Sequence, residues 1–256
     1  MRKPLPAVKL FLAGLLVATV MAGSVAAITY GLPDGNRHPS VGALVGTFTS
    51  GTFPYCSGTL ISPTVFVTAA HCNIGRSRVA VTFDSEYTAH ARLHAGTFYG
   101  DPRYTWKQDD PHDLAVVVFD KPVNGITPAR LPFAGQLEGL TQADRFTAVG
   151  YGGQEPVNEP GGPVIAYYDT REYAISSFNA LNGAWLRLSQ NPATDDGGTC
   201  YGDSGGPNFL GAGATETDII AGTTITGDAL CKATNVTYRL DTADARSFLG
   251  NFVSLP

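Results

Sequence analysis

The segment that decides the fold of this chain is Thr199-Cys200-Tyr201-Gly202-Asp203-Ser204-Gly205-Gly206-Pro207. It places Ser204 between glycines, one residue after a carboxylate and four residues after a cysteine. Three glycines in five residues are costly in a purely structural loop, because glycine loses more conformational freedom on folding than any other residue. They permit a tight turn whose backbone N–H groups point toward one place beside the Ser204 hydroxyl. The segment therefore predicts either an ordinary glycine-rich turn or a nucleophilic serine with an adjoining oxyanion site.

A serine hydroxyl becomes a useful nucleophile only when a base takes its proton and a third group orients that base. The candidate bases are five histidines, all of which precede Ser204: His38, His71, His90, His94 and His112. The α/β-hydrolases are excluded, because in them the histidine follows the serine. The remaining chain order is His, Asp, Ser, with His71 in the run VTAAHC and Asp113 directly before the apolar run Leu114–Phe119.

These three segments together resemble those of the trypsin/chymotrypsin-like serine proteases, of the secreted bacterial type. His71 and Asp113 are 42 residues apart and Asp113 and Ser204 are 91 apart, which suits that family over most of the chain from Ile28 onward. The resemblance implies that Ser204 is the nucleophile, His71 the general base and Asp113 the carboxylate that orients the imidazole. The N–H groups of Gly202 and Ser204 would bind the oxyanion, and no cofactor or metal ion is expected.

The fold that the resemblance implies is all-β, with two packed six-stranded antiparallel β-barrels and a C-terminal helix. The 30 glycines and 17 prolines agree with many turns between short strands. We expect the first barrel over residues 28–130, the second over 131–240 and the helix over 242–253. Apolar or alternating runs predict strands at Val41–Val45, Ser57–Ile61, Thr64–Thr68, Arg78–Phe83, Leu114–Phe119, Arg145–Gly150, Trp185–Ser189, Gly205–Phe209, Ile219–Thr224 and Val236–Leu240.

Residues 1–27 have the three parts of a secretory signal peptide. Basic residues precede a 13-residue apolar run, Leu10–Ala22, which is followed by the small residues GSVAA. A transmembrane anchor would need about 20 apolar residues, so we expect a secreted, extracellular protein without a membrane anchor. Cleavage after Ala27 would leave Ile28 as the first residue. The alternative is cleavage after Ala26 or earlier, with trimming by another protease.

The first residue of the mature chain has a role in the family that this sequence resembles. The resemblance implies that the free α-amino group of Ile28 pairs inside the protein with Asp203 and so shapes the oxyanion loop. No propeptide is visible between Ala27 and Ile28, so signal peptidase itself would generate the activating N-terminus. One residue left in front of Ile28 should prevent the pairing, because an unpaired buried carboxylate costs several kcal/mol.

The charge balance narrows the expected partners. Removing residues 1–27 takes away three positive charges and changes the formal net charge from −5 to −8. Nucleic acids and anionic membranes call for basic surfaces, so neither is an expected partner. We expect protein or peptide substrates, proteinaceous inhibitors and a monomeric protein.

Four cysteines in a secreted chain predict two disulfides, for which the sequence alone allows three pairings. The resemblance selects Cys56–Cys72 and Cys200–Cys231. The first would tie the loop of His71 to the preceding strand, and the second would close a loop around the substrate pocket. Each would contribute roughly 2–4 kcal/mol to stability.

The resemblance also places the primary specificity pocket, at Gly198, Thr199 and Gly227. In the family, the residue six before the nucleophile lies at the pocket floor. Here that residue is Gly198 rather than an aspartate, so a preference for arginine or lysine is not supported. Gly227, four residues before Cys231, matches a wall glycine that leaves the entrance open. We expect a preference for apolar residues before the scissile bond.

One segment departs from the family pattern. Where relatives usually have Ser-Trp-Gly, this chain has Ile225-Thr226-Gly227. It therefore lacks the serine that helps to hold the triad carboxylate, unless Thr224 or Thr226 substitutes for it. The alternative function is a catalytically silent homologue that acts as a binding module. Such proteins usually lose a triad member, whereas all three are present here.

Two further groups of residues have the chemistry of metal ligands. His90 and His94 are four residues apart, but the run lacks the glutamate of the zinc-protease pattern and a third ligand. We interpret them as surface histidines on a strand or loop. The acidic pair Asp109–Asp110 would suit calcium, and a solvated loop is the alternative that we favour.

Overall fold

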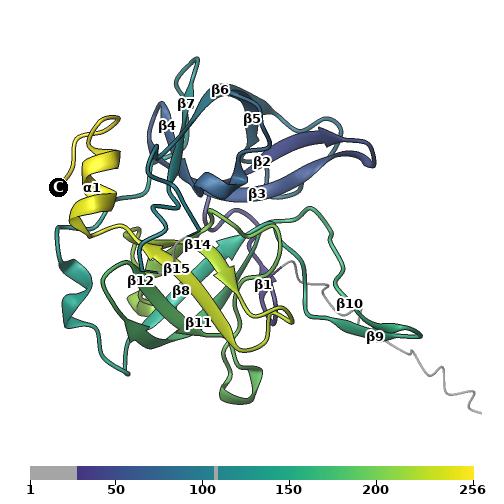
Figure 1. Ribbon diagram of the computed structural model, residues 1–256. Helices are drawn as coiled ribbons and strands as arrows, with labels where there is room; N and C mark the ends of the chain where they lie inside the picture. The colour runs from purple at the N-terminus through teal and green to yellow at the C-terminus, as the bar shows by residue number, and fades with distance from the viewer. Residues whose placement is uncertain (1–27, 107–108) are drawn as a thin grey trace, which may run out of the picture.

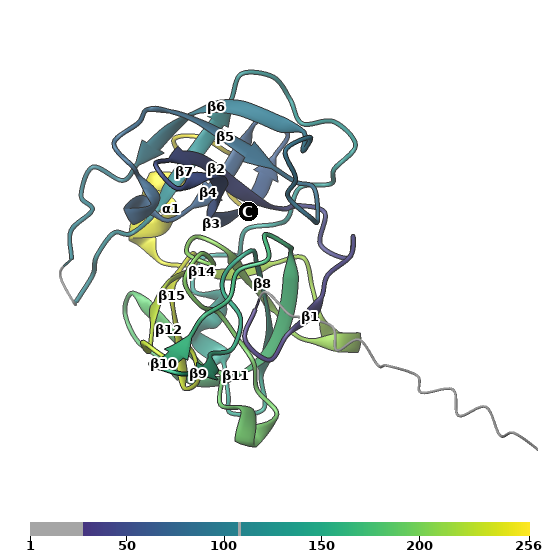
Figure 2. The same cartoon turned by 90° about the vertical axis from the view of Figure 1, so that its right-hand side faces the viewer.

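Two six-stranded antiparallel barrels make up most of the protein, and they pack against each other as Figures 1 and 2 show from two sides. The computed structural model describes residues 28–106 and 109–256, and the signal peptide expected over residues 1–27 lies outside them. The expected all-β fold with two barrels and a C-terminal helix is confirmed. Among the described residues, no helix is both long enough and apolar enough to cross a membrane.

The first barrel closes in the strand order β2-β3-β4-β7-β6-β5. Its strands are β2 (Val41–Phe48), β3 (Gly51–Ser62), β4 (Val65–Thr68), β5 (Arg78–Thr82), β6 (Leu93–Gly100) and β7 (Ala115–Phe119). Phe66 fills the interior, where its ring meets Phe83 edge-on and lies 6.1 Å from that of Phe119. The continuous apolar run of β7 is almost wholly buried, as expected for a strand covered on both faces.

The second barrel runs in the order β8-β11-β12-β15-β14-β13, and β8 pairs with both β11 and β13, which closes the ring. Its strands are β8 (Arg145–Gly150), β11 (Glu172–Leu181), β12 (Trp185–Ser189), β13 (Pro207–Leu210), β14 (Ile220–Gly227) and β15 (Thr234–Arg239). The short strand β1 (Leu32–Pro33) adds to β11. The N-terminal segment therefore joins the second barrel, although we expected residues 28–130 in the first.

Several short elements lie outside the barrels. A hairpin of β9 (Val157–Glu159) and β10 (Gly162–Val164) projects from the second barrel in Figure 1. The 3-10 turns are η1 (Ala70–Cys72), η2 (Gln136–Gly139), η3 (Pro192–Thr194) and η4 (Gly213–Thr215). The helix α1 (Ala243–Leu249) begins at the cap Thr242, which accepts a hydrogen bond from Ala245 N. It ends before residue 253, because Gly250 terminates it and glycine favours helix poorly.

Every predicted strand overlaps an observed one, but the barrel strands β6 and β11 and the short strands β1, β9 and β10 were not predicted. In β11 the side chain of Ser176 is buried and donates to Gly197 O at 2.7 Å. The sequence of β11 therefore lacks the regular alternation of apolar and polar residues that predicts a strand. β13 begins at Pro207 rather than at Gly205, because the preceding glycines form the turn that carries Ser204.

Candidate active site

Neighbouring strands of the first barrel bring His71 and Asp113 together. β4 and β7 are paired with Thr68 opposite Ala115, His71 follows β4 in the turn η1, and Asp113 precedes β7. Asp113 Oδ1 accepts the backbone N–H of His71 at 2.9 Å, and Oδ2 lies 2.7 Å from the ring Nδ1. Asp113 is only 1% exposed. A carboxylate at Nδ1 fixes the tautomer with the proton on that nitrogen, which leaves Nε2 as the basic atom.

Ser57 of β3 anchors the loop that carries Ser204 to the first barrel. Ser57 N donates to Ser204 O at 2.8 Å, and the Ser57 hydroxyl donates to Gly202 O at 3.0 Å. The same hydroxyl accepts the N–H of Tyr151 at 3.0 Å. A single buried serine therefore joins the nucleophile loop of the second barrel to the wall of the first.

Two glycines of this loop are required by the geometry. Gly202 has φ +99°, and a Cβ there would lie 2.9 Å from Gly152 Cα. Gly205 has φ +80°, and a Cβ there would lie 2.1 Å from Thr68 Oγ1 and 2.5 Å from Ser57 O. Positive φ disfavours residues that carry a Cβ, and the contacts leave no space for one. The glycines that the sequence singled out thus let two barrels meet closely at Ser204.

The loop presents two N–H groups for which the described part of the chain supplies no acceptor. Within residues 28–106 and 109–256, neither Gly202 N nor Ser204 N donates a hydrogen bond, whereas the intervening Asp203 N donates to Cys200 O at 3.1 Å. In the same part of the chain, Ser204 and His71 make no hydrogen bond to each other. Their loops are nevertheless adjacent, since Cys72 Sγ lies 3.7 Å from Ser204 O.

Asp203 is a fully buried carboxylate held by two backbone donors. Gly152 N donates to its Oδ1 at 2.7 Å and Cys200 N to its Oδ2 at 2.8 Å. Burial raises the pKa of Asp203 to about 8, although the two backbone hydrogen bonds act in the opposite direction. No cationic side chain forms an ion pair with it among the described residues. Gly150 also leaves room for the carboxylate, since a Cβ there would lie 2.1 Å from Oδ1.

Ile28, the other member of the expected activation pair, is fully buried beside Ala148 of β8 and Ala174 of β11. The next residue, Thr29, forms a two-way backbone bridge with Gly198, with both N···O distances 3.0 Å. The start of the described chain is thus held against the second barrel. Ala148, which lies beside Ile28, is two residues before Gly150 in β8.

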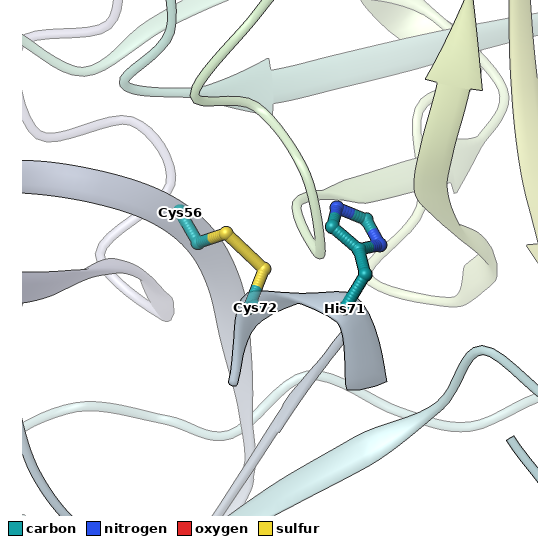
Figure 3. Close-up of side chains that lie close together, drawn as sticks. All are labelled: Cys56, His71 and Cys72. Atoms are coloured by element: carbon teal, nitrogen blue, oxygen red, sulfur yellow. A yellow bond between two sulfur atoms is a disulfide. The ribbon is translucent and has the colours of Figure 1, made fainter. Parts of the chain in front are cut away.

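Both expected disulfides are present, Cys56–Cys72 and Cys200–Cys231. Figure 3 shows the first of them beside His71, which projects from the same short turn. The two sulfur atoms and an imidazole nitrogen lie within 4.8 Å of one another, a spacing that also suits a metal ion. Because the sulfurs are bonded to each other, neither is a thiolate ligand.

A cavity of about 240 Å³ adjoins Ser204. Its lining residues are Thr199, Cys200, Tyr201, Ser204, Thr224, Ile225, Thr226, Gly227, Asp228, Ala229 and Cys231. Of the three residues that the resemblance assigns to the pocket, Thr199 and Gly227 line this cavity and Gly198 does not. A Cβ on Gly198 would lie 2.3 Å from Gln190 Oε1 and 2.7 Å from Gln190 Cβ. The Gln190 side chain therefore occupies the space expected for a floor residue at position 198.

Neither threonine near the departure from the family pattern substitutes for the missing serine. The Thr224 hydroxyl accepts a hydrogen bond from Asn208 Nδ2 at 3.0 Å, and Thr226 is exposed. Among the described residues, the hydrogen bonds to the Asp113 carboxylate come from His71 alone. The carboxylate is instead protected by its burial.

The other candidate ligands have structural roles. His94 lies in β6 with its ring 5.6 Å from that of Phe83, and burial lowers its pKa. Asp110 Oδ1 accepts the hydroxyl of Tyr238 at 3.0 Å and the N–H of His112 at 3.0 Å. These contacts explain the histidine and the acidic residue without a metal ion.

Sequence reasoning did not find Ser57, Gln190 or Asp228 near the site. It also missed Trp106, which is 73% exposed and whose ring lies 5.9 Å from that of His71. Each of these residues lies outside the three motifs: Ser57 in β3, Gln190 and Asp228 directly after β12 and β14, and Trp106 in the loop between β6 and β7. The only signal for Asp228 was its position directly after the wall glycine, Gly227.

The comparisons with known proteins agree with this geometry. A family model described as Trypsin matches residues 34–242. The chain is 27% identical over 180 residues to the thrombin-like enzyme acutin of Deinagkistrodon acutus. The aligned residues cover 64% of this chain and 72% of that protein. It is 27% identical over 182 residues to a trypsin of Phaedon cochleariae. Here the aligned residues cover 61% of this chain and 64% of that protein.

A third relative is the snake venom serine protease 2B of Craspedocephalus gramineus, 30% identical over 187 residues that cover 67% of this chain and 68% of that protein. The family match includes both barrels, both disulfides and the three segments around His71, Asp113 and Ser204. The protein therefore belongs to the trypsin family of serine proteases.

Proposed function

We propose that the protein is a secreted endopeptidase that hydrolyses peptide bonds with Ser204, His71 and Asp113. The observation that carries this proposal is the double contact between His71 and Asp113 beside a loop whose Gly202 and Ser204 N–H groups donate to no acceptor within residues 28–106 and 109–256. That combination supplies a base of fixed tautomer and two N–H donors for an oxyanion at one place. The names of the relatives, which include a trypsin and a snake venom serine protease, support proteolysis.

In the first half of the reaction, His71 Nε2 takes the proton of the Ser204 hydroxyl as Ser204 Oγ attacks the substrate carbonyl. The carbonyl oxygen becomes an oxyanion and binds the N–H groups of Gly202 and Ser204. Loss of one such donor costs about 2.7–4 kcal/mol in other enzymes. His71 then gives its proton to the leaving amine, and an acyl-enzyme remains on Ser204.

In the second half, water replaces the amine. His71 removes a proton from the water as the water attacks the acyl carbonyl, the oxyanion forms again at the same donors, and Ser204 leaves as an alkoxide that regains the proton. Asp113 stabilises the imidazolium that forms in both halves and is not itself protonated. None of these steps needs a cofactor.

Activation rests on the buried carboxylate of Asp203. A carboxylate whose pKa burial raises to about 8 is stabilised by a cation brought to it. The proposed cation is the α-amino group of Ile28, released when signal peptidase cleaves after Ala27. The burial of Ile28 and the backbone bridge from Thr29 to Gly198 support this assignment. Residues 1–27 would direct secretion, and both disulfides suit an oxidising compartment.

The decisive test is the intact mass of the secreted protein before and after treatment with a fluorophosphonate. We expect a chain that begins at Ile28 and gains one adduct, and the Ser204→Ala variant should gain none. A chain that begins at Ile28 without an adduct would favour the silent binding module. A longer chain without an adduct would mean that signal peptidase alone does not activate the protein.

A further inference from the structure

A second buried carboxylate, Glu172 of β11, lies in the part of the second barrel that holds the N-terminal segment. It is 1% exposed, and the proposed reaction gives it no role. Its partner across the sheet is Gly150 of β8, two residues along from the pair Ala174 and Ala148. Side chains alternate between the two faces of a strand, so Glu172 shares a face of the sheet with Ala174.

Ile28 and Asp203 lie on that same face. Ile28 packs against both alanines of the neighbouring pair. The Asp203 carboxylate occupies the place that a side chain would take at Gly150, where a Cβ would lie 2.1 Å from Oδ1. The first residue of the expected mature chain and two carboxylates therefore share one surface of the paired strands β8 and β11.

The turn that follows Ile28 packs directly against β11 beside Glu172. Ile28 O accepts the N–H of Gly31 at 3.0 Å, and a Cβ on Gly31 would lie 2.9 Å from Tyr173 O. Strand β1 then pairs with the same part of β11, with Pro33 opposite Glu172. The N-terminal segment therefore runs alongside Glu172, which fixes its first residues there.

The two carboxylates are close enough to interact electrostatically. Burial is the largest cause of the raised pKa of Asp203, and the charge of Glu172 acts in the same direction. Like charges in a buried site are costly, and a cation placed beside them reduces the cost. In the proposed activation, the α-amino group of Ile28 is the cation that arrives at this surface.

A buried α-ammonium group also needs acceptors for its three N–H donors. Each oxygen of Asp203 already accepts one backbone N–H, Oδ1 from Gly152 and Oδ2 from Cys200. Glu172 brings a second carboxylate to the surface on which Ile28 packs. Two carboxylates therefore supply this ammonium group with more acceptors, and with more negative charge, than Asp203 alone.

Other ionisable groups lie around the N-terminal segment. Glu155 accepts a backbone N–H of that segment at 3.2 Å. Burial and the charge of Asp203 raise the pKa of Tyr167, so its hydroxyl is neutral at neutral pH. Arg171 pairs with Asp34 at 2.7 Å. Arg171 is the one cation of this group, and its ion pair already balances its charge, so it does not replace the α-amino group.

We propose that Glu172 is a second positioning residue of activation, which binds the α-ammonium group of Ile28 together with Asp203 and holds the mature N-terminus in place. The inference rests on the proposed protease activity and on cleavage after Ala27. Glu172 acts on the oxyanion loop through the N-terminus and Asp203, without contact with the substrate. The second carboxylate keeps the N-terminus charged and inserted to a higher pH than one carboxylate would.

The test is the pH profile of kcat/KM for the mature native protein and for Glu172→Gln, from about pH 6 to 10. At high pH the α-ammonium group loses its proton, the pairing ends and activity falls. An α-amino group in water titrates at about pH 7.7–8.0, and adjacent carboxylates move this loss to higher pH. Glutamine keeps the size of the side chain and removes one charge. The midpoint of the alkaline loss should therefore fall by at least about one pH unit.

The matched control is Glu159→Gln, which changes an exposed glutamate of the β9–β10 hairpin and should keep the native midpoint. A second readout is the rate at which cyanate carbamylates the α-amino group of Ile28, followed by mass spectrometry. We expect at least about tenfold faster reaction in Glu172→Gln than in the control, because a less firmly held N-terminus is exposed more often. A lower melting temperature with an unchanged midpoint and rate would assign Glu172 to packing alone and overturn the inference.

Two outcomes separate the inference from the proposed function. An unchanged alkaline midpoint in Glu172→Gln, with full fluorophosphonate labelling of Ser204, would overturn the role of Glu172 and leave the protease activity established. A native protein that takes no fluorophosphonate would overturn the protease activity and this inference with it.

If Glu172→Gln does not fold, NMR of the Glu172 carboxyl carbon decides, in a Ser204→Ala background that prevents self-digestion. Its titration is compared between the mature chain and a chain with one alanine added before Ile28. A nearby ammonium group favours the carboxylate, so the midpoint should be lower in the mature chain. Equal midpoints in the two chains would overturn the inference.

Discussion

Asp113 contacts His71 at two points, with Oδ1 on the backbone N–H at 2.9 Å and Oδ2 beside the ring Nδ1 at 2.7 Å. One buried carboxylate therefore fixes both the main chain and the imidazole of the same residue. Since His71 follows β4 and Asp113 precedes β7, the register of two paired strands sets the orientation of the ring. The orientation is a property of the barrel rather than of a flexible loop.

Replacing Asp113 with asparagine should therefore abolish most activity without unfolding the protein. The amide presents a donor to Nδ1, which favours the tautomer with the proton on Nε2, where it cannot accept the serine proton. We expect kcat to fall by about 10⁴-fold. Steady-state kinetics on a peptide substrate measure the loss, and Asp120→Asn, at an exposed ion pair with Arg78, is the control. A loss below tenfold in Asp113→Asn would remove Asp113 from the mechanism.

Gly205→Ala should damage the site through sterics alone. The new methyl group would meet Thr68 Oγ1 and Ser57 O well inside van der Waals contact, and φ is +80° at this position. The loop must move away from the first barrel, so we expect at least about 100-fold lower kcat/KM and a lower melting temperature. Gly139→Ala is the control, because a Cβ there meets no atom within 4 Å. Activity of Gly205→Ala equal to that of the control would show that the loop does not need its observed position.

An alanine added before Ile28 should make stability depend on pH in a way that the native mature chain does not. Without a cation, the pKa of Asp203 is about 8, far above that of an aspartate in an unfolded chain, about 3.9. The folded state then binds more protons than the unfolded state between these values, so stability falls as the pH rises from about 4 to 8. An α-amino group beside Asp203 favours the carboxylate and removes this loss.

The measurement is the melting temperature of both chains in a Ser204→Ala background, which prevents self-digestion. The gap between the native and the extended chain should widen from pH 5 to pH 8. The extended chain with an intact Ser204 should also have low activity at both values. Equal melting temperatures at both pH values, together with full activity of the extended chain, would contradict the pairing of Ile28 with Asp203.

Arg171→Met tests a buried link between the barrels. Arg171 is 1% exposed, its Nε donates to Asp34 Oδ2 at 2.7 Å, and its Nη1 donates to Val41 O and Phe83 O at 2.9 and 3.0 Å. Removing it leaves Asp34 buried without its guanidinium partner, so we expect a loss of about 3–5 kcal/mol in the free energy of unfolding. Urea denaturation measures it.

The control for this loss is Arg37→Met. Arg37 pairs with Glu216 at 3.0 Å but is 40% exposed, so its loss should cost about 0–1 kcal/mol. Equal midpoints for the two variants would mean that the Arg171 network contributes no more than a surface ion pair. The comparison is direct, because both variants replace an arginine with the same unbranched side chain.

The sequence predicts well what depends on local chemistry. The run around Ser204 requires glycines at the two positive-φ positions where no Cβ fits, and these requirements are visible in the residue types. The apolar run Leu114–Phe119 similarly indicates a buried strand, with Asp113 at its start. Such features need no knowledge of how distant segments pair.

The sequence does not predict the features that arise where segments distant in the chain meet in the fold. Gln190 lies beside Gly198 because β12 ends against the segment after Cys231, where Gln190 N donates to Ala233 O at 3.1 Å. Arg171 finds one of its acceptors, Val41 O, on β2, beyond reach of any local pattern. The Gln190 side chain likewise comes from the end of another strand, so no pattern around position 198 predicts it.

In the proposed activation, the bridge between Thr29 and Gly198 would couple two events that are separate in the chain. Thr29 adjoins the residue whose amino group cleavage would release, and Gly198 adjoins Thr199, which lines the substrate cavity. A ligand that orders the cavity must then favour insertion of the N-terminus by the same free energy by which insertion favours the ligand, because such coupling is reciprocal. Maturation and substrate recognition would therefore form one thermodynamic cycle, in which a tightly bound ligand compensates for an imperfect N-terminus.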